Sequence, residues 1–288
     1  MTFDEGLRTI IGDCLSHIRS HEASVAAGAD PESVHQMRVG LRRLKCALQL
    51  FAPARSLWRA QRDELDGLAT TLGAARDWQV LASDTLPSLD ADCLGDAGWT
   101  ALQHAVRSVA SENGHAAAEA VRSARYRQLV AALQAWVDGA HWRDTLSASE
   151  RDALQALLRQ TADRALGRQH ARLIKRGRRL GQASAAQRHR ARIAAKKLRY
   201  ATGFFQALYP APRVARFTAA LAALQDALGA LNDGVVARGL LRRLANDQPA
   251  VAPAAHAAIK ALAHRRRSGR HALGRSWAHF TRAARPWA

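Results

Sequence analysis

Residues 34–51 read VHQMRVGLRRLKCALQLF, a stretch with one histidine, four basic residues and no carboxylate. At about 100° per residue, four of these side chains fall within an arc of about 80° on a helical wheel: His35, Arg38, Arg42 and Lys45. The adjoining arc is apolar, so the stretch predicts an amphipathic helix with a buried face and a cationic stripe. Like charges one turn apart destabilise an isolated helix, so a negative partner is expected from outside it.

The same pattern recurs as HRARIAAKKLRYATGFF at 189–205. His35, Arg38, Arg42, Arg43 and Lys45 match, in this order, His189, Arg192, Lys196, Lys197 and Arg199. A second block, LDGLATTLGAARD (65–77), matches LAALQDALGALND (221–233). Because two separate blocks recur in the same order, the chain is predicted to contain a duplicated helical unit.

The loop HWRDTLSAS at 141–149 is the predicted division between the two copies. This gives an N-terminal helical bundle over residues 1–146 and a C-terminal bundle over 147–288. A pseudo-twofold axis would relate the bundles, and their two basic helices would face each other across a basic central groove.

The composition predicts an all-α fold. Hydrophobic residues make up 48 % of the 288 residues and aromatic residues 6 %, while β-branched residues are scarce, which favours helices over sheets. DPES at 30–33 offers Asp30 as an N-cap and Pro31 as the first helical residue. SAAQ at 184–187 has the spacing of a capping box.

The charge is large and uneven. The formal net charge is +19, but residues 1–146 hold 15 Lys and Arg against 18 Asp and Glu, and residues 147–288 hold 28 against 6. Between Arg159 and Arg199 there are fourteen basic residues and one acid, Asp163. Such an asymmetry indicates a surface directed at a polyanion: nucleic acid, a polyphosphate or an anionic membrane.

Two alternatives for the basic residues stay open. The stripes could be solvated or could pair with carboxylates of neighbouring helices, for which Asp77 and Asp233, at matching positions of the repeat, are the candidates. The cluster HRRRSGRH at 264–271 could extend a groove or form a solvated helix end.

Nothing in the sequence indicates a metal, a cofactor or a membrane anchor. Cys14, Cys46 and Cys93 show no metal spacing, and His17 and His21 lack a clear third ligand. The start of the chain lacks the features of a signal peptide, and no stretch is expected to reach the length of a membrane span. A cytoplasmic protein without a membrane partner is expected.

The basic blocks, LGAARD, LGALND and the terminal RPW together resemble the CHAD domain, the conserved histidine α-helical domain. The resemblance covers nearly the whole chain. It implies two pseudo-symmetric helical bundles around a basic groove, binding of inorganic polyphosphate and, for some members, association with polyphosphate granules. The implied binding residues are His35, Arg38, Arg42, Arg43, Lys45, His189, Arg192, Lys196, Lys197 and Arg199, with Arg76 as a further candidate. Since Arg76 matches Asn232, a contact there would exist in one half only.

Three functions are weighed. The favoured one is binding of inorganic polyphosphate without catalysis, in which His35 and His189 donate hydrogen bonds and strengthen the site when protonated near or below pH 6.5. An enzyme that hydrolyses or transfers polyphosphate is the second, although the blocks contain neither a carboxylate metal site nor a Walker loop. The third is nucleic-acid binding, which would normally add aromatic stacking platforms to the basic stripes. Nucleic acid is therefore expected only as a competing polyanion.

Overall fold

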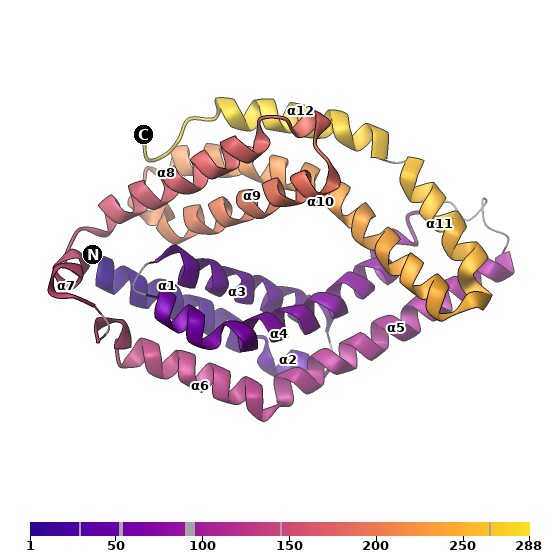
Figure 1. Cartoon of the computed structure of the whole chain (residues 1–288), viewed down its shortest axis with the longest axis horizontal. Coiled ribbons are helices and arrows are strands. Elements are labelled where there is room, and N and C mark those ends of the chain that lie inside the picture. Colours follow the sequence, from indigo (N-terminus) through magenta and orange to yellow (C-terminus); the bar gives the residue numbers. More distant parts are fainter. Residues whose placement is uncertain (29, 52–53, 90–95, 145, 265) are drawn as a thin grey trace. The chain divides into compact units, whose positions relative to one another are not determined.

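The computed structural model describes residues 1–28, 30–51, 54–89, 96–144, 146–264 and 266–288, with the side chains of 96, 97, 150, 153, 264 and 266–270 left aside. Within these residues the regular secondary structure is helical (Figure 1), and the β-type pairing is one antiparallel bridge between Thr2 and Leu157. The prediction of an all-α fold is confirmed.

The chain forms two compact units, each built from two separate segments. Unit 1 contains Met1–Arg76 and Ser111–Ala165, and unit 2 contains Asp77–Ala110 and Leu166–Ala288. The predicted division at 146/147 separates consecutive halves, whereas in these units the segment 77–110 belongs with C-terminal residues. The duplication inferred from the repeated blocks stays a prediction.

Unit 1 is built mainly from the helices that precede residue 166. They are α1 (Phe3–Arg19), α2 (Glu22–Ala26), α3 (Pro31–Leu50), most of α4 (Arg55–Val80), the second half of α5 (Asp96–Arg122), α6 (Ala124–Asp138) and α7 (Ala148–Leu154). Helices α1 and α3 pack closely. A Cβ atom on Gly40 would lie 2.8 Å from the His17 ring and 2.9 Å from the Ile18 side chain, so glycine permits this close approach.

The first turn of α1 is tied to the short 3₁₀ turn His141–Arg143. Trp142 Nε1 donates a 2.6 Å hydrogen bond to Asp4 Oδ1, and Arg143 forms an ion pair with the same carboxylate. Burial alone would raise the pKa of Asp4, but the hydrogen bonds from Arg143 and Trp142 hold it below its ordinary value. These contacts join the start of the chain to residues about 140 positions later and hold unit 1 together.

Unit 2 is built around one long helix. Its main helices are α8 (Leu158–Gly177), α9 (Ala185–Phe205), α10 (Ala211–Asp247), α11 (Ala252–His264) and α12 (Arg266–Arg282), and a π-helical turn (Leu81–Thr85) follows α4. Helix α10 packs against α9, α11 and α12. Aromatic side chains fill the space between α10 and the chain end, where the Trp287 and Phe217 rings lie 5.0 Å apart.

Helix α10 corrects one sequence expectation. By length and composition it is apolar enough to cross a membrane, although no stretch was expected to reach that length. Its apolar side chains are used within unit 2, since Phe217, Leu221 and Leu224 are 0 % exposed. This packing is that of a core helix.

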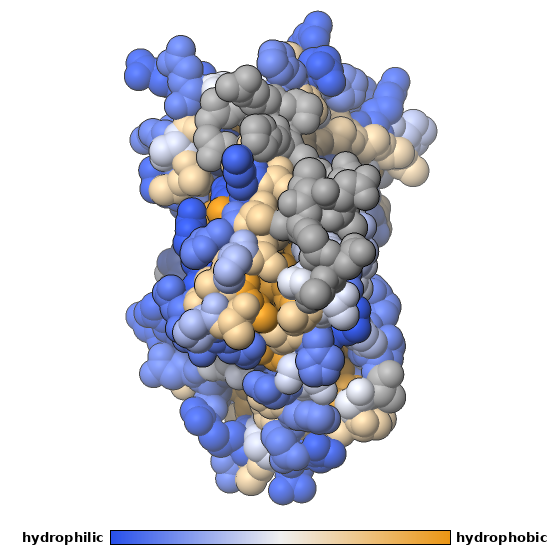
Figure 2. Space-filling view, turned by 90° about the vertical axis from the view of Figure 1, so that its right-hand side faces the viewer, coloured by the Kyte–Doolittle hydropathy of each residue, from blue (hydrophilic) through white to orange (hydrophobic). Residues whose placement is uncertain are grey.

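An apolar cluster joins the two segments of unit 2. Trp78, Leu102 and Val106 of the first segment pack with Leu241 and Ala255 of the second. Figure 2 faces the side on which α11 lies and shows pale and orange, apolar residues bordered by hydrophilic ones. The segment 77–110 therefore belongs to the core of unit 2.

Candidate anion-binding site

Helix α3 begins where the sequence predicts. The Asp30 carboxylate accepts hydrogen bonds from the backbone N–H groups of Glu32 (2.9 Å) and Ser33 (3.0 Å), and Pro31 is the first helical residue. Four apolar side chains of α3 are at most 1 % exposed: Met37, Leu41, Leu44 and Leu48. The predicted amphipathic helix is confirmed, and its basic side chains lie half-buried beside the apolar face.

His35 lies among arginines from two helices. Burial and the charges of Arg76, Arg38 and Arg42 lower the pKa of His35 below its ordinary value, and Glu32 opposes this in part. Arg38 Nη1 also reaches across to α4, where it donates a 3.4 Å hydrogen bond to the Gly73 carbonyl. The fold thus brings Arg76 of α4 to the stripe of α3. As a result, His35 is protonated only at a lower pH than the sequence led us to expect.

Lys45 differs from the sequence expectation, because its positive charge has a carboxylate partner. Its Nζ forms an ion pair with Asp66 of α4 and lies 5.8 Å from the centre of the Trp58 ring. The hydrogen bond from Lys45, aided by Arg62, outweighs burial and lowers the pKa of Asp66. The charge of Lys45 is therefore matched by a carboxylate within unit 1.

Arg43 points toward α1, away from the group around His35. Its charge acts on Cys14 and on His17, two residues of α1. This agrees with its place off the stripe on the helical wheel. Burial raises the pKa of the Cys14 thiol to about 12, so this cysteine is not a nucleophile at neutral pH.

In unit 2, helix α9 also begins at its predicted cap. Ser184 and Gln187 form a capping box, with hydrogen bonds of 3.2 Å and 2.7 Å. The buried face consists mainly of small residues and two large ones: Ala191, Ala194, Ala195, Leu198, Ala201 and Phe205. His189 and Arg199 are exposed, whereas Arg192, Lys196 and Lys197 are half-buried.

One imidazole and one guanidinium of α9 are held by neutral side chains of α10. His189 Nδ1 lies 3.1 Å from Asn232 Oδ1, and because an amide oxygen only accepts, the imidazole donates. Arg199 Nη1 donates a 3.0 Å hydrogen bond to Gln225 Oε1. The Gln225 amide in turn donates a 2.8 Å bond to the Ala195 carbonyl, so it is fixed from both sides. These contacts orient both side chains, and the neutral amide of Gln225 does not cancel the charge of Arg199.

Arg192 has a weaker carboxylate partner. Its Nη2 lies 3.8 Å from Asp233 Oδ1, and the Asp233 side chain is 55 % exposed. The pairing that the sequence left open as an alternative therefore occurs at this position. Within the residues that the structure describes, the buried Nε of Arg192 has no hydrogen-bond partner, so this atom gives up no hydrogen bond when the guanidinium turns toward an anion.

The comparisons with known proteins identify the family. The family model described as the CHAD domain matches residues 9–242. The chain belongs to the CHAD domain family. The crystal structure of the CHAD domain from the plant Ricinus communis is 36 % identical, with a TM-score of 0.85 over 99 % of this chain and 93 % of that one.

A second solved structure shares the fold of this CHAD domain. PptA from Streptomyces chartreusis is 17 % identical, with a TM-score of 0.63 over 98 % of this chain and 99 % of that chain. Among curated proteins, none matches the sequence significantly. The structural likeness extends beyond the residues that the family model covers.

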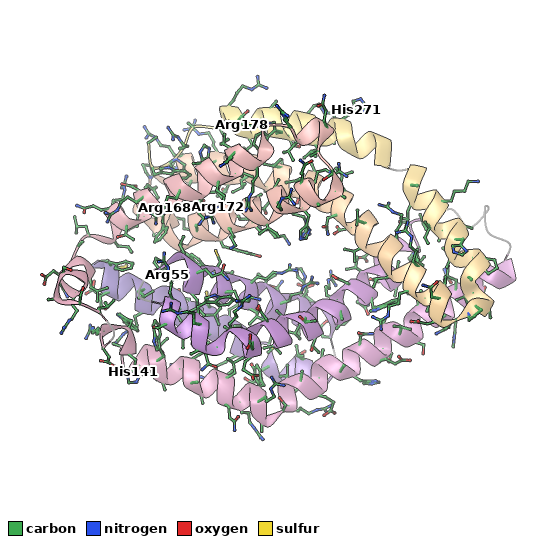
Figure 3. The ribbon with its side chains drawn as sticks, in the orientation of Figure 1. Arg55, His141, Arg168, Arg172, Arg178 and His271 are labelled. Carbon is green, nitrogen blue, oxygen red and sulfur yellow. The ribbon has the colours of Figure 1, made fainter. Side chains whose placement is uncertain are left out.

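Helix α8 of this CHAD domain carries basic residues that the sequence counted but did not assign to the site. Arg168, Arg172 and Lys175 are exposed and recur at helical spacing, and exposed Arg179 follows the end of the helix. Figure 3 labels Arg168 and Arg172 on α8. Arg176 Nη1 donates a 3.1 Å hydrogen bond to the Arg190 carbonyl, which fixes α8 beside α9. The signal that could have found this stripe was the run of basic residues that starts at Arg159.

The remaining histidines do not assemble a metal site in the part of the chain that the structure describes. His17 Nε2 is bonded to the Gln36 carbonyl at 3.2 Å, and the His17 and His21 rings meet edge to face at 5.1 Å. The cluster at 264–271, apart from His271, lies outside the described side chains.

Proposed function

We propose that this CHAD domain binds inorganic polyphosphate and neither hydrolyses nor transfers it. The binding residues are the stripes of α3 and α9, with Arg76 added from α4. The observation that carries the proposal is the way α9 holds His189 and Arg199. Neutral amide oxygens orient both groups, and no carboxylate cancels the charge of Arg199 within the described residues, so this charge stays available to a ligand.

A phosphate chain suits these cations. Guanidinium groups bind phosphate oxygens in a bidentate manner, and ammonium groups act as compact point charges, so successive phosphates can meet successive turns of a helix. Polyphosphate has no bases, so it needs no aromatic platform. Four tryptophans are at most 8 % exposed and serve the cores: Trp78, Trp99, Trp136 and Trp142.

The aromatic residues near the stripes favour polyphosphate over nucleic acid as the specific ligand. Single-strand binding proteins combine a basic groove with aromatic side chains on which bases stack. Within the described part of α3 and α9, the aromatic residues near the stripes are Phe51, Tyr200, Phe204 and Phe205, and the two at the helix ends, Phe51 and Phe205, are buried. Nucleic acid would compete through charge alone.

The test is a competition titration at physiological salt. Long-chain polyphosphate and single-stranded RNA of matched total charge compete for the purified protein while free phosphate is monitored. We expect polyphosphate to bind at least about tenfold more tightly, a difference of about 1.4 kcal/mol, without release of phosphate. Equal competition would reduce the site to a general polyanion surface, and phosphate release would revive the enzyme hypothesis.

A granule-associated location in the cytoplasm follows from the proposal. A protein that binds long phosphate chains will concentrate wherever these chains accumulate. Fluorescence microscopy of the tagged protein in cells with and without polyphosphate granules would check this. A diffuse signal in both would contradict it.

A further inference from the structure

A second basic feature of unit 2 lies outside the two stripes. It is a pocket of about 780 Å³ between the first turns of α10, the last turn of α12 and the residues that follow α12. This volume is in the range of about 300–1,000 Å³ that is typical of small-molecule sites. All residues that line the pocket belong to unit 2.

Four cationic or imidazole side chains line this pocket: Arg213, Arg216, His279 and Arg285. The lining contains no Asp or Glu side chain. In the part of the chain that the structure describes, none of the four has a carboxylate within ion-pair distance. The hydrogen bond that is present, from Arg216 Nε to the Pro212 carbonyl at 3.3 Å, orients one guanidinium with a neutral acceptor.

The backbone adds to this positive field. Helix α10 begins at Ala211, its N-cap Pro210 offers no side-chain hydrogen bond, and Arg213 and Arg216 stand one turn apart on its first turns. The start of a helix carries a partial positive charge that favours anions. The pocket therefore combines three guanidinium groups with the positive end of a 37-residue helix.

The rest of the lining is small and apolar. Ala219 and Ala220 of α10 and Ala283 and Ala284 after α12 belong to the lining, and Ala220 is almost fully buried. A bare phosphate chain gains nothing from methyl groups, whereas a ligand with an uncharged body buries apolar surface against them. The pocket thus presents cations for phosphates and alanines for the body that carries them.

A pocket of unit 1 contains a cation that a carboxylate neutralises. It has a volume of about 320 Å³ and is lined by Glu64 and Arg125 among others. There the carboxylate accepts two hydrogen bonds from the guanidinium, at 2.9 Å and 2.8 Å. The charge of Arg125 is cancelled locally there, whereas the guanidinium groups that line the pocket of unit 2 have no such carboxylate among the described residues.

We propose that the pocket between α10 and the end of α12 binds a small organic anion that carries two or more phosphate groups, of the size of a nucleoside triphosphate. Arg213, Arg216 and Arg285 hold the phosphates, and the uncharged body lies against the alanines. This site is separate from the polyphosphate stripes, so occupancy of one does not require the residues of the other.

The experiment is calorimetric titration of the full chain, tagged at its N-terminus so that the pocket is unaltered. The probes are ATP, inorganic tripolyphosphate and inorganic phosphate, and long-chain polyphosphate is measured alongside. ATP should bind at least about fivefold more tightly than tripolyphosphate, and phosphate should bind weakest. Arg213→Gln with Arg216→Gln should weaken ATP binding at least about tenfold, as expected for loss of charge-assisted hydrogen bonds.

The matched control is Arg242→Gln with Arg243→Gln, which removes the same charge from the exposed far end of α10. It should leave ATP binding within about twofold. His279→Gln gives a milder variant if the double change unfolds the protein, and it should weaken ATP binding by about two- to threefold.

Three results would overturn the proposal. One is the absence of ATP binding, and another is equal weakening by the pocket and control variants. The third is that tripolyphosphate binds as tightly as ATP, which would show that the organic body of the ligand contributes nothing to binding. Failure of the stripes would appear separately, as weak binding of long-chain polyphosphate by the unaltered protein.

Discussion

Lys45 of α3 and Arg199 of α9 occupy matching positions of the two basic blocks, but the following helix treats them differently. In unit 1, α4 places Asp66 against Lys45 and forms an ion pair. In unit 2, the repeat puts Ala222 where unit 1 has Asp66, and Gln225 one turn further on accepts a hydrogen bond from Arg199. One cation is neutralised and the other is only oriented.

The difference shows that the sequence of a basic helix does not by itself reveal which of its cations are neutralised. What decides the charge available to a ligand is the residue that the neighbouring helix places opposite each cation. A carboxylate makes the cation a structural element, whereas an amide leaves it for an anion. On this basis we expect α9 to contribute more than α3 to the proposed polyphosphate binding at this position.

The largest effect should come from removing the two cations one at a time. Arg199→Ala should weaken polyphosphate binding about tenfold and make the log–log salt dependence shallower by about 0.7, the value for one phosphate contact. Lys45→Ala should weaken it no more than about twofold, because Asp66 already satisfies that ammonium. Salt-dependent titrations of both variants test this, and equal losses would contradict the comparison.

A transplanted carboxylate should have the next largest effect. Ala222→Asp recreates in unit 2 the arrangement around Lys45 and should weaken polyphosphate binding by about three- to fivefold through pairing with Arg199. Ala223→Asp adds the same charge at the adjacent, exposed position and serves as the control. If both variants bind alike, net charge alone explains the effect and the pairing does not.

The reverse change should have a smaller effect of opposite sign. Asp66→Asn frees Lys45 and should tighten binding by about two- to threefold, since a surface pair of this kind is worth up to about 1 kcal/mol. Asp63→Asn removes a carboxylate from an exposed position of the same helix and should change binding less. Binding that is unchanged or weaker in Asp66→Asn would show that Lys45 takes no part even when it is unpaired.

The smallest effect concerns pH. Burial and three arginines lower the pKa of His35 below 6.5 in the free protein, and a bound phosphate chain would raise it again. Affinity should therefore increase by up to about twofold as the pH falls from about 7.5 to 5.5. His35→Gln should remove this increment, and exposed His115 offers the control His115→Gln. A profile that His35→Gln leaves unaltered would assign the pH effect elsewhere.

The same shift has a consequence for stability. Because the folded protein holds His35 with a lowered pKa, the unfolded chain binds this proton more readily. The stability that neutral His35 contributes is thus present above about pH 6.5 and is lost as the pH falls below that value. Thermal unfolding of the free protein at several pH values, with and without His35→Gln, measures it.

The sequence predicts the local features of this molecule well. The caps at Asp30 and Ser184 begin the two basic helices as expected. The apolar face of each helix is buried, with Leu41 and Leu44 on α3 and Leu198 and Phe205 on α9, because a period of 3.6 residues describes one helix packed against a core. The position of Arg43 off the stripe also follows from the helical wheel.

The features that the sequence did not predict depend on contacts between distant segments. Asp66 lies opposite Lys45 because α4 packs beside α3, and the acid is absent from the matching position of the repeat. The lowered pKa of His35 comes from burial and from the charge of Arg76, which lies near the end of α4 and packs close to His35. The pocket of unit 2 unites residues of α10 with residues that follow α12, and neither segment has a motif by itself.

The exchange of segments between the units has a consequence for protein synthesis. A ribosome that has completed residues 1–146 has produced Trp78, Leu102 and Val106, but their partners Leu241 and Ala255 have not yet been made. Unit 1 is also open at this stage, because Ser147–Ala165 is missing from it. The nascent chain therefore carries an uncovered apolar surface for nearly half of its translation, and a fragment that ends at residue 146 would expose the same surface to chaperones and to aggregation.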